Sequence, residues 1–195
     1  YWPYYLNVPN SASSTTLLVE PNNTGYGDDD PAVHDQAARQ LAEWRTHYAQ
    51  ELRSPLLVPA FPRPYTDWQV YTQALDRDTL QTALPNLQRI DLQLIAMIND
   101  ATEMLSGMGI NVDYRVFIMG FSASGMFTNR FTVLHPDRVK AAAIGSPGGW
   151  PIAPAGVWQG ETLRYHVGVA DLEQLIGKPF DLGLFRTVSL FFYLG

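Results

Sequence analysis

Arg115-Val-Phe-Ile-Met-Gly-Phe-Ser-Ala-Ser-Gly-Met126 is the stretch of the sequence that decides the predicted fold. Residues 115–119 predict a strand without polar alternation, as expected in a parallel sheet that is covered on both faces. The apolar residues that follow recur at helical spacing, and they are Phe127, Phe131 and Leu134. Pro136 predicts the end of that helix. Ser122 therefore stands at a turn between a buried strand and a helix.

Strand and helix patterns also alternate on both sides of this turn. Further buried strands are predicted at residues 15–20, 55–60, 139–144 and 188–194. One helical stripe comprises Val33, Ala37, Leu41, Trp44, Tyr48 and Leu52, and another comprises Leu87, Ile90, Leu94, Met97, Ala101 and Leu105. Such alternation predicts βαβ units, and so an α/β fold: a mostly parallel sheet with helices on both faces.

The length favours one domain. A chain of 195 residues with 46% hydrophobic residues can build one well-buried core but hardly two. Residues 150–186 are rich in Gly and Pro, and they separate two predicted strands by more than an ordinary connection. We therefore expect a single domain over residues 1–195, with residues 150–186 as a cap or lid insertion.

Composition excludes several classes of function. The net charge of −6 comes from 13 basic and 19 acidic residues, and no run of Lys or Arg offers a surface for nucleic acid. The chain has no Cys, which excludes disulfides, thiolate nucleophiles and Cys-bound zinc. Its apolar runs fall short of the roughly 18 residues that span a bilayer, so a soluble protein is expected. Compartment and oligomeric state stay open.

The turn at Ser122 resembles the G-x-S-x-G nucleophile elbow of α/β hydrolases, with Ser124 in place of the second Gly. The residues two before and two after the nucleophile must be small so that strand and helix can approach, and Gly120 and Ser124 both qualify. Ser124 is the rival nucleophile, but Met126 would then occupy a position that has to be small. The resemblance implies a Ser-His-acid triad, an oxyanion hole of two backbone N–H groups, and no cofactor.

The same resemblance assigns the oxyanion hole. The N–H of Ala123 matches the donor that follows the nucleophile, and the loop of residues 21–25 corresponds to the segment that supplies the second donor. Register points to Asn23, with Asn22 as the alternative and as a substrate contact, although the loop lacks the family's usual His and first Gly. An Asn-rich turn without a catalytic role is the other interpretation.

Other side chains are candidates for binding a substrate or a cation. Trp68 and Trp150 fall in loops at strand ends, where an aromatic ring can stack on a substrate, although packing in the core or lid explains them as well. The carboxylates of residues 28–30 with His34 could coordinate a hard cation. Acidic residues are also common at a helix N-terminus, so we expect no metal site.

These residues predict a serine hydrolase that cleaves a small or polymeric carboxylic ester through an acyl-enzyme on Ser122. The resemblance extends to esterases and lipases, and to enzymes that depolymerise polyesters. A peptidase, thioesterase or acyltransferase would use the same elbow. The contrasting hypothesis is a binding protein that keeps the hydrolase fold without catalysis.

The expected base and acid have no suitable candidates in the sequence. In α/β hydrolases the chain order is nucleophile, acid and then His. Only His135 and His166 follow Ser122; His135 ends the helix after the elbow, and His166 precedes the acids Asp171 and Asp181. We therefore expect an incomplete domain whose natural polypeptide continues past Gly195 with the acid and the His.

Overall fold

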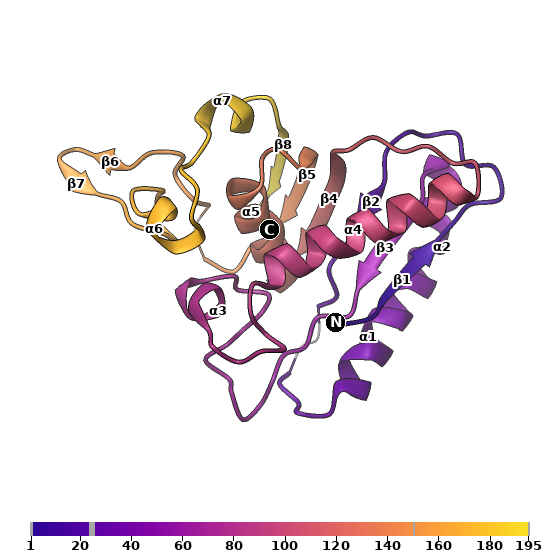
Figure 1. Cartoon of the computed structure of the whole chain (residues 1–195), viewed down its shortest axis with the longest axis horizontal. Coiled ribbons are helices and arrows are strands. Elements are labelled where there is room, and N and C mark those ends of the chain that lie inside the picture. Colours follow the sequence, from indigo (N-terminus) through magenta and orange to yellow (C-terminus); the bar gives the residue numbers. More distant parts are fainter. Residues whose placement is uncertain (1, 24–25, 150, 195) are drawn as a thin grey trace.

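A computed structural model describes residues 2–23, 26–149 and 151–194, and its centre is a six-stranded sheet (Figure 1). The strands are β1 (Tyr4–Asn7), β2 (Leu18–Val19), β3 (Leu56–Pro59), β4 (Val116–Phe121), β5 (Val139–Gly145) and β8 (Ser189–Tyr193). Their order is β1-β3-β2-β4-β5-β8. Only β1 is antiparallel to its neighbour within this sheet, and the other neighbouring pairs are parallel. The predicted α/β class with a mostly parallel sheet is confirmed.

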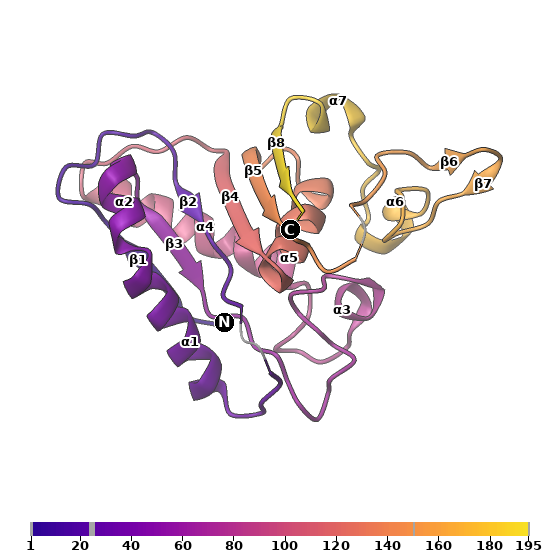
Figure 2. The same cartoon turned by 180° about the vertical axis from the view of Figure 1, so that it is seen from behind.

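Helices cover both faces of the sheet. α4 (Ile90–Gly107) and α5 (Ala123–Leu134) lie on the face seen in Figure 1, and α1 (Pro31–Trp44) and α2 (Thr46–Leu52) come forward in Figure 2. Two groups of buried side chains fill the space between the helices and the sheet. The larger group includes Phe127 and Phe131, whose rings stack with centroids 5.8 Å apart.

The two predicted helical stripes have different outcomes. The stripe from Leu87 to Leu105 is buried, as predicted. The stripe from Val33 to Leu52 is wrong by one residue: His34, Ala38 and Ala42 face the sheet, while Trp44 is 67% exposed. Small alanines let the helix approach the sheet closely, Leu41 packs at the margin of this core, and Trp44, Tyr48 and Leu52 are exposed.

Arg45 also divides the helix predicted from the stripe of Val33 to Leu52 into α1 and α2. Its guanidinium makes two hydrogen bonds, of 2.7 and 2.9 Å, to the buried carboxylate of Glu20 directly after β2. These hydrogen bonds raise the pKa of Arg45. The ion pair forms one wall of a hollow of about 650 Å³, which Leu41, Trp44 and Phe121 also line.

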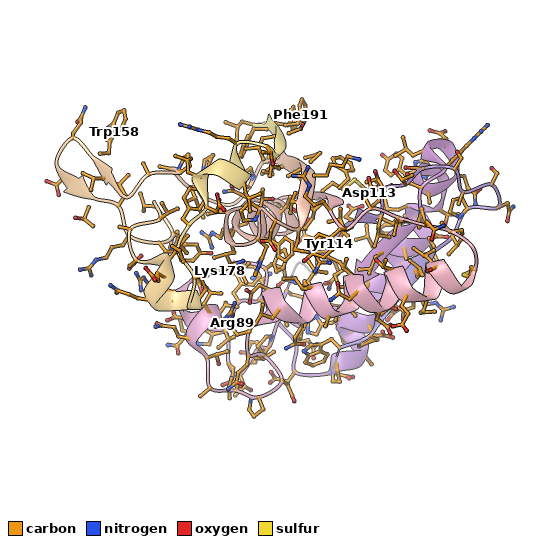
Figure 3. All side chains as sticks on the ribbon, turned by 45° about the horizontal axis from the view of Figure 1, so that its top comes forward. Arg89, Asp113, Tyr114, Trp158, Lys178 and Phe191 are labelled. Atoms are coloured by element: carbon orange, nitrogen blue, oxygen red, sulfur yellow. The ribbon has the colours of Figure 1, made fainter. Side chains whose placement is uncertain are left out.

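The segment of residues 150–186 contains short elements of its own. β6 (Val157–Trp158) and β7 (Glu161–Thr162) form a separate hairpin, followed by α6 (Leu172–Ile176) and α7 (Leu182–Phe185). The hairpin projects away from the main sheet, with Trp158 at its tip (Figure 3). The Tyr165 hydroxyl donates to the carbonyl of Leu75, which ties the base of the segment to the core. Its role as a cap or lid stays a prediction.

A buried carboxylate connects the start of α4 to the end of α5. Asp91 accepts hydrogen bonds from Arg89, at 2.9 and 2.7 Å, and lies 2.8 Å from Nε2 of His135. Burial raises the pKa of Asp91, but the hydrogen bonds from His135 and Arg89 outweigh burial and lower this pKa to about 2. His135 caps the C-terminal end of α5, as predicted, and its side chain is buried. The cluster of Asp91, Arg89 and His135 therefore has a structural role.

Asp91→Asn is expected to lower the free energy of unfolding by about 3 kcal/mol at pH 7, because it removes one partner of a buried charged cluster. The folded-state pKa lies below the ordinary value of 3.8, so the contribution of the carboxylate is complete above pH 3.8 and is lost as the pH falls through about 2. Urea unfolding at pH 7 and pH 3 should show a smaller difference between variant and wild type at pH 3.

Asp113→Asn is the matched control for this measurement. Its carboxylate pairs with Lys140 at 2.7 Å, but both side chains are almost half exposed, so the variant should change stability much less. A deficit of Asp91→Asn that grows on acidification would contradict the assigned role.

Candidate active site

Ser122 occupies the sharp turn between β4 and α5. Its φ and ψ are 57° and −119°, a positive φ that non-glycine residues rarely adopt. Its N–H donates to the carbonyl of Gly145 at 2.9 Å, and its carbonyl accepts from Met126 at 2.9 Å. The serine side chain is exposed. Backbone strain held in place by such contacts, at an exposed hydroxyl, is typical of functional sites.

Two glycines make this turn possible. A Cβ added at Gly120 would lie 2.3 Å from the carbonyl oxygen of Ser124, and one added at Gly125 would lie 2.5 Å from that of Gly145. Both contacts are with backbone atoms, which cannot move aside as a flexible side chain can. The strand, the turn and the helix therefore approach one another only because both positions lack a side chain.

Ser124 has a structural place in the same turn. It is 3% exposed, and its hydroxyl donates to the carbonyl of Phe121 at 2.9 Å and accepts from the N–H of Phe121 at 3.0 Å. A hydroxyl that is buried and already both donates and accepts a hydrogen bond is poorly placed to attack a substrate. This geometry favours Ser122 over Ser124 as the nucleophile.

The predicted oxyanion loop lies beside the elbow. The side-chain amide of Asn23 donates to the carbonyl of Phe121 at 3.0 Å, next to Ser122. The N–H of Ala123 lies in the first turn of α5, where N–H groups have no carbonyl partner within the helix. The loop and the start of α5 therefore come together at one end of β4. Thr24 and Gly25 lie outside the described residues.

Asn22 has a different environment from Asn23. Its side chain is fully buried, donates to the carbonyl of Phe61 at 3.0 Å and accepts from the N–H of Phe61 at 2.8 Å. These contacts fasten the loop after β2 to the loop after β3. They argue for a structural role of this side chain and against a substrate contact.

The two predicted aromatic contacts have separate outcomes. Trp68 is 71% exposed in the loop after β3, at the same edge of the sheet as Ser122, because β2, β3 and β4 are parallel. Trp150 lies outside the described residues. Sequence reasoning passed over Tyr26 and Tyr65, which are also exposed in loops at this edge; a signal was available, since each closely follows a predicted strand.

The histidines lie elsewhere in the fold. His34 is buried with Nε2 2.8 Å from the carbonyl oxygen of Asp28, and His47 contacts Trp44. In the described part of the chain, none of the four histidines hydrogen-bonds to Ser122. The expectation that acid and base follow Gly195 stays a prediction.

The carboxylates of Asp28 and Asp30, in the acidic loop before α1, accept hydrogen bonds from nearby backbone N–H groups. Asp28 accepts from the N–H of Asp30, and Asp30 accepts from the N–H of Ala32 at 2.9 Å as the N-cap of α1. Within residues 2–23, 26–149 and 151–194, no group of three or more His, Cys, Asp or Glu side chains is arranged to hold a metal ion. No helix in those ranges has the length and apolar character needed to cross a bilayer.

Comparisons with known proteins bear on the fold. No protein-family model and no curated protein matches the chain. The structure of poly(aspartic acid) hydrolase-1 from Sphingomonas sp. KT-1 matches 97% of the chain with a TM-score of 0.64 and 17% identity. That of LpqC, a poly(3-hydroxybutyrate) depolymerase from Bordetella parapertussis, matches 97% with a TM-score of 0.59 and 15% identity.

The chain spans 65% of the first of these proteins and 58% of the second. Identities this low carry information on the fold alone. Together with the order of the sheet and the strand-turn-helix at Ser122, these likenesses show that the chain has the α/β-hydrolase fold.

Proposed function

We propose that the protein containing this chain is a carboxylic ester hydrolase with Ser122 as its nucleophile. The observation that carries the proposal is the conformation of Ser122: a non-glycine residue with a φ of 57°, exposed between β4 and α5. A simple helix cap would require no such strain, because Ser caps helices from the extended region. The side chain of Ser122 also makes no capping hydrogen bond.

The proposed reaction follows from the groups at the elbow. The Ser122 hydroxyl attacks the ester carbonyl as a base takes its proton, and collapse of the tetrahedral intermediate expels the alcohol and leaves an acyl-enzyme. The N–H groups of Ala123 and Asn23 stabilise the negative oxygen. The base gives its proton to the departing alcohol; water, deprotonated by the same base, then attacks the acyl group, which leaves as the carboxylic acid as Ser122 regains its proton. The base is a histidine that we place outside residues 1–195.

A covalent phosphonate complex tests the arrangement of these groups. In a crystal structure of the full-length protein after reaction with a phosphonate ester, we expect one phosphonyl oxygen about 3 Å from the N–H of Ala123 and from that of Asn23. The phosphorus should be bonded to Ser122 Oγ. An oxygen held by other donors, with the Asn23 loop turned away, would contradict the oxyanion assignment while leaving the nucleophile in place.

The choice of an ester over an amide rests on the resemblance of the elbow to that of esterases and lipases; the two structural neighbours are named as a poly(aspartic acid) hydrolase and a poly(3-hydroxybutyrate) depolymerase and do not decide it. The same elbow serves peptidases, thioesterases and acyltransferases. Matched substrates that differ only in the scissile atom distinguish them: we expect turnover of the oxygen ester and not of the corresponding amide.

A further inference from the structure

Three exposed aromatic side chains lie at the edge of the sheet that carries Ser122. Tyr26 is 62% exposed after β2, and Tyr65 and Trp68 are 72% and 71% exposed after β3. β2 and β3 are parallel to each other and to β4, so their following loops emerge beside the elbow. Exposed aromatic groups that gather at one place mark binding sites more often than isolated ones.

The two loops are fastened to each other. Oδ1 of Asp29 accepts hydrogen bonds of 2.9 Å from the N–H groups of both Tyr65 and Thr66, and Oδ2 accepts from the Thr66 hydroxyl. A Cβ added at Gly27 would lie 3.3 Å from Cα of Tyr65. Tyr26 and Tyr65 therefore project from backbone segments that are in contact with each other.

The fastened loops are also connected to the elbow. Asn22 exchanges two hydrogen bonds with the backbone of Phe61, and the amide of Asn23 donates to Phe121 next to Ser122. Hydrogen bonds between the loops, joined by short stretches of backbone, therefore connect the backbone at Tyr65 to Phe121, the residue before Ser122. Ordering before binding lowers the entropic cost of recognising a ligand.

The charges around the rings are acidic. Residues 28–30 are three aspartates, and hydrogen bonds from Thr66 and Tyr65 hold the pKa of Asp29 below its usual range, so it stays ionised. Arg63 is a positively charged residue in the loop after β3, but its guanidinium lies over the ring of Tyr71, 4.3 Å from the ring centroid. A polyanion would be repelled from this edge, whereas an uncharged ligand with flat or apolar parts fits it.

We propose that Tyr26, Tyr65 and Trp68 form a binding platform for an uncharged polyester, on which the polymer lies next to Ser122. The inference deepens the proposed function, because it names the substrate class of the same site. Asp29 is the positioning residue that holds the loop of Tyr65 against the loop of Tyr26.

Adsorption tests the platform separately from catalysis. Full-length protein carrying Ser122→Ala is mixed with suspended poly(3-hydroxybutyrate) particles, and the protein left in solution gives an apparent Kd. Trp68→Ala in this background should raise that Kd about tenfold, the effect of a strong aromatic contact. Soluble poly(aspartic acid), a polyanion, should not compete with the particles for the protein.

Trp158→Ala is the matched control, since Trp158 is 65% exposed but lies at the tip of the hairpin of β6 and β7 (Figure 3). It should leave the Kd unchanged. An equal loss in both tryptophan variants, or none in Trp68→Ala, would overturn the platform, as would competition by poly(aspartic acid). Labelling of Ser122 by a fluorophosphonate in the protein without Ser122→Ala reports on the proposed function independently.

Asp29 has its own pair of variants. Asp29→Ala removes all three hydrogen bonds to the loop of Tyr65 and should weaken adsorption to the particles severalfold. Asp29→Asn keeps an oxygen that can accept from both N–H groups, so it should restore most of the binding. Equal adsorption by Asp29→Ala and wild type would contradict the positioning role.

Discussion

Ser122→Ala is expected to reduce ester hydrolysis by the full-length protein by about 10⁴-fold or more, with some residual acceleration left by substrate binding and the oxyanion hole. The change removes the oxygen that attacks the ester. The hydroxyl of Ser124 cannot replace it, because Ser124 is buried and its hydroxyl is hydrogen-bonded to both the N–H and the carbonyl of Phe121. Initial rates with p-nitrophenyl esters of short acids measure the effect. Thermal unfolding of the variant should resemble that of the wild type.

Ser124→Ala is the control for this experiment. It deletes two hydrogen bonds inside the elbow, so we expect a loss of about 1–2 kcal/mol of stability with hydrolysis retained. If Ser124→Ala lost activity as completely as Ser122→Ala while remaining folded, both hydroxyls would be needed, and the assignment of Ser124 to a structural role would be wrong.

Gly120→Ala is expected to be the most destabilising small substitution in the elbow, with a loss of about 3 kcal/mol or more. The new Cβ would meet three backbone atoms of Ser124 and Gly125 at 2.3 to 2.8 Å, so β4 and α5 must separate. That separation moves Ser122 as well, and activity should fall along with stability. Urea unfolding and initial rates on the same preparation measure both effects.

Gly107→Ala provides the contrast. Gly107 is the last residue of α4, and a Cβ there would meet nothing within 4 Å. Alanine favours the helix, so this variant should be neutral or gain up to about 1 kcal/mol. Similar stabilities for Gly120→Ala and Gly107→Ala would contradict the close approach at the elbow.

Much of the fold was predictable because its signals are local. The apolar runs of β3, β4 and β5 and the stripe of α4 each lie in one stretch of sequence, and each was predicted near its observed place. β1 was missed: residues 4–7 form a short edge strand that pairs antiparallel with β3, and nothing in their own pattern indicates that partner.

The errors have physical reasons. The face of α1 that packs on the sheet is formed by Ala38 and Ala42 with His34, and such a face is not marked by a stripe of large apolar side chains. The burial of His135 beside Asp91, which lies 44 positions away in the sequence, was not predicted. Contacts at that separation leave no periodic signal.

The site was predictable in part. The elbow was recognised from a strand, a turn and a helix in one short segment, and Ser124 was rejected on spacing. The different environments of Asn22 and Asn23 could not be predicted, because they depend on Phe61 and Phe121, which belong to distant strands and loops. The contact between the loops of Tyr26 and Tyr65 could not be predicted either, because it joins segments far apart in the sequence.

The most direct test of Ser122 as the nucleophile is covalent labelling of the full-length protein with a fluorophosphonate, followed by mass mapping of the modified peptide. Residues 115–130 contain both Ser122 and Ser124, and fragmentation of that peptide separates them. We predict a single phosphonyl group on Ser122, retained in Ser124→Ala and absent from Ser122→Ala. A label on Ser124, or an enzyme that hydrolyses esters without any label in this peptide, would contradict the account.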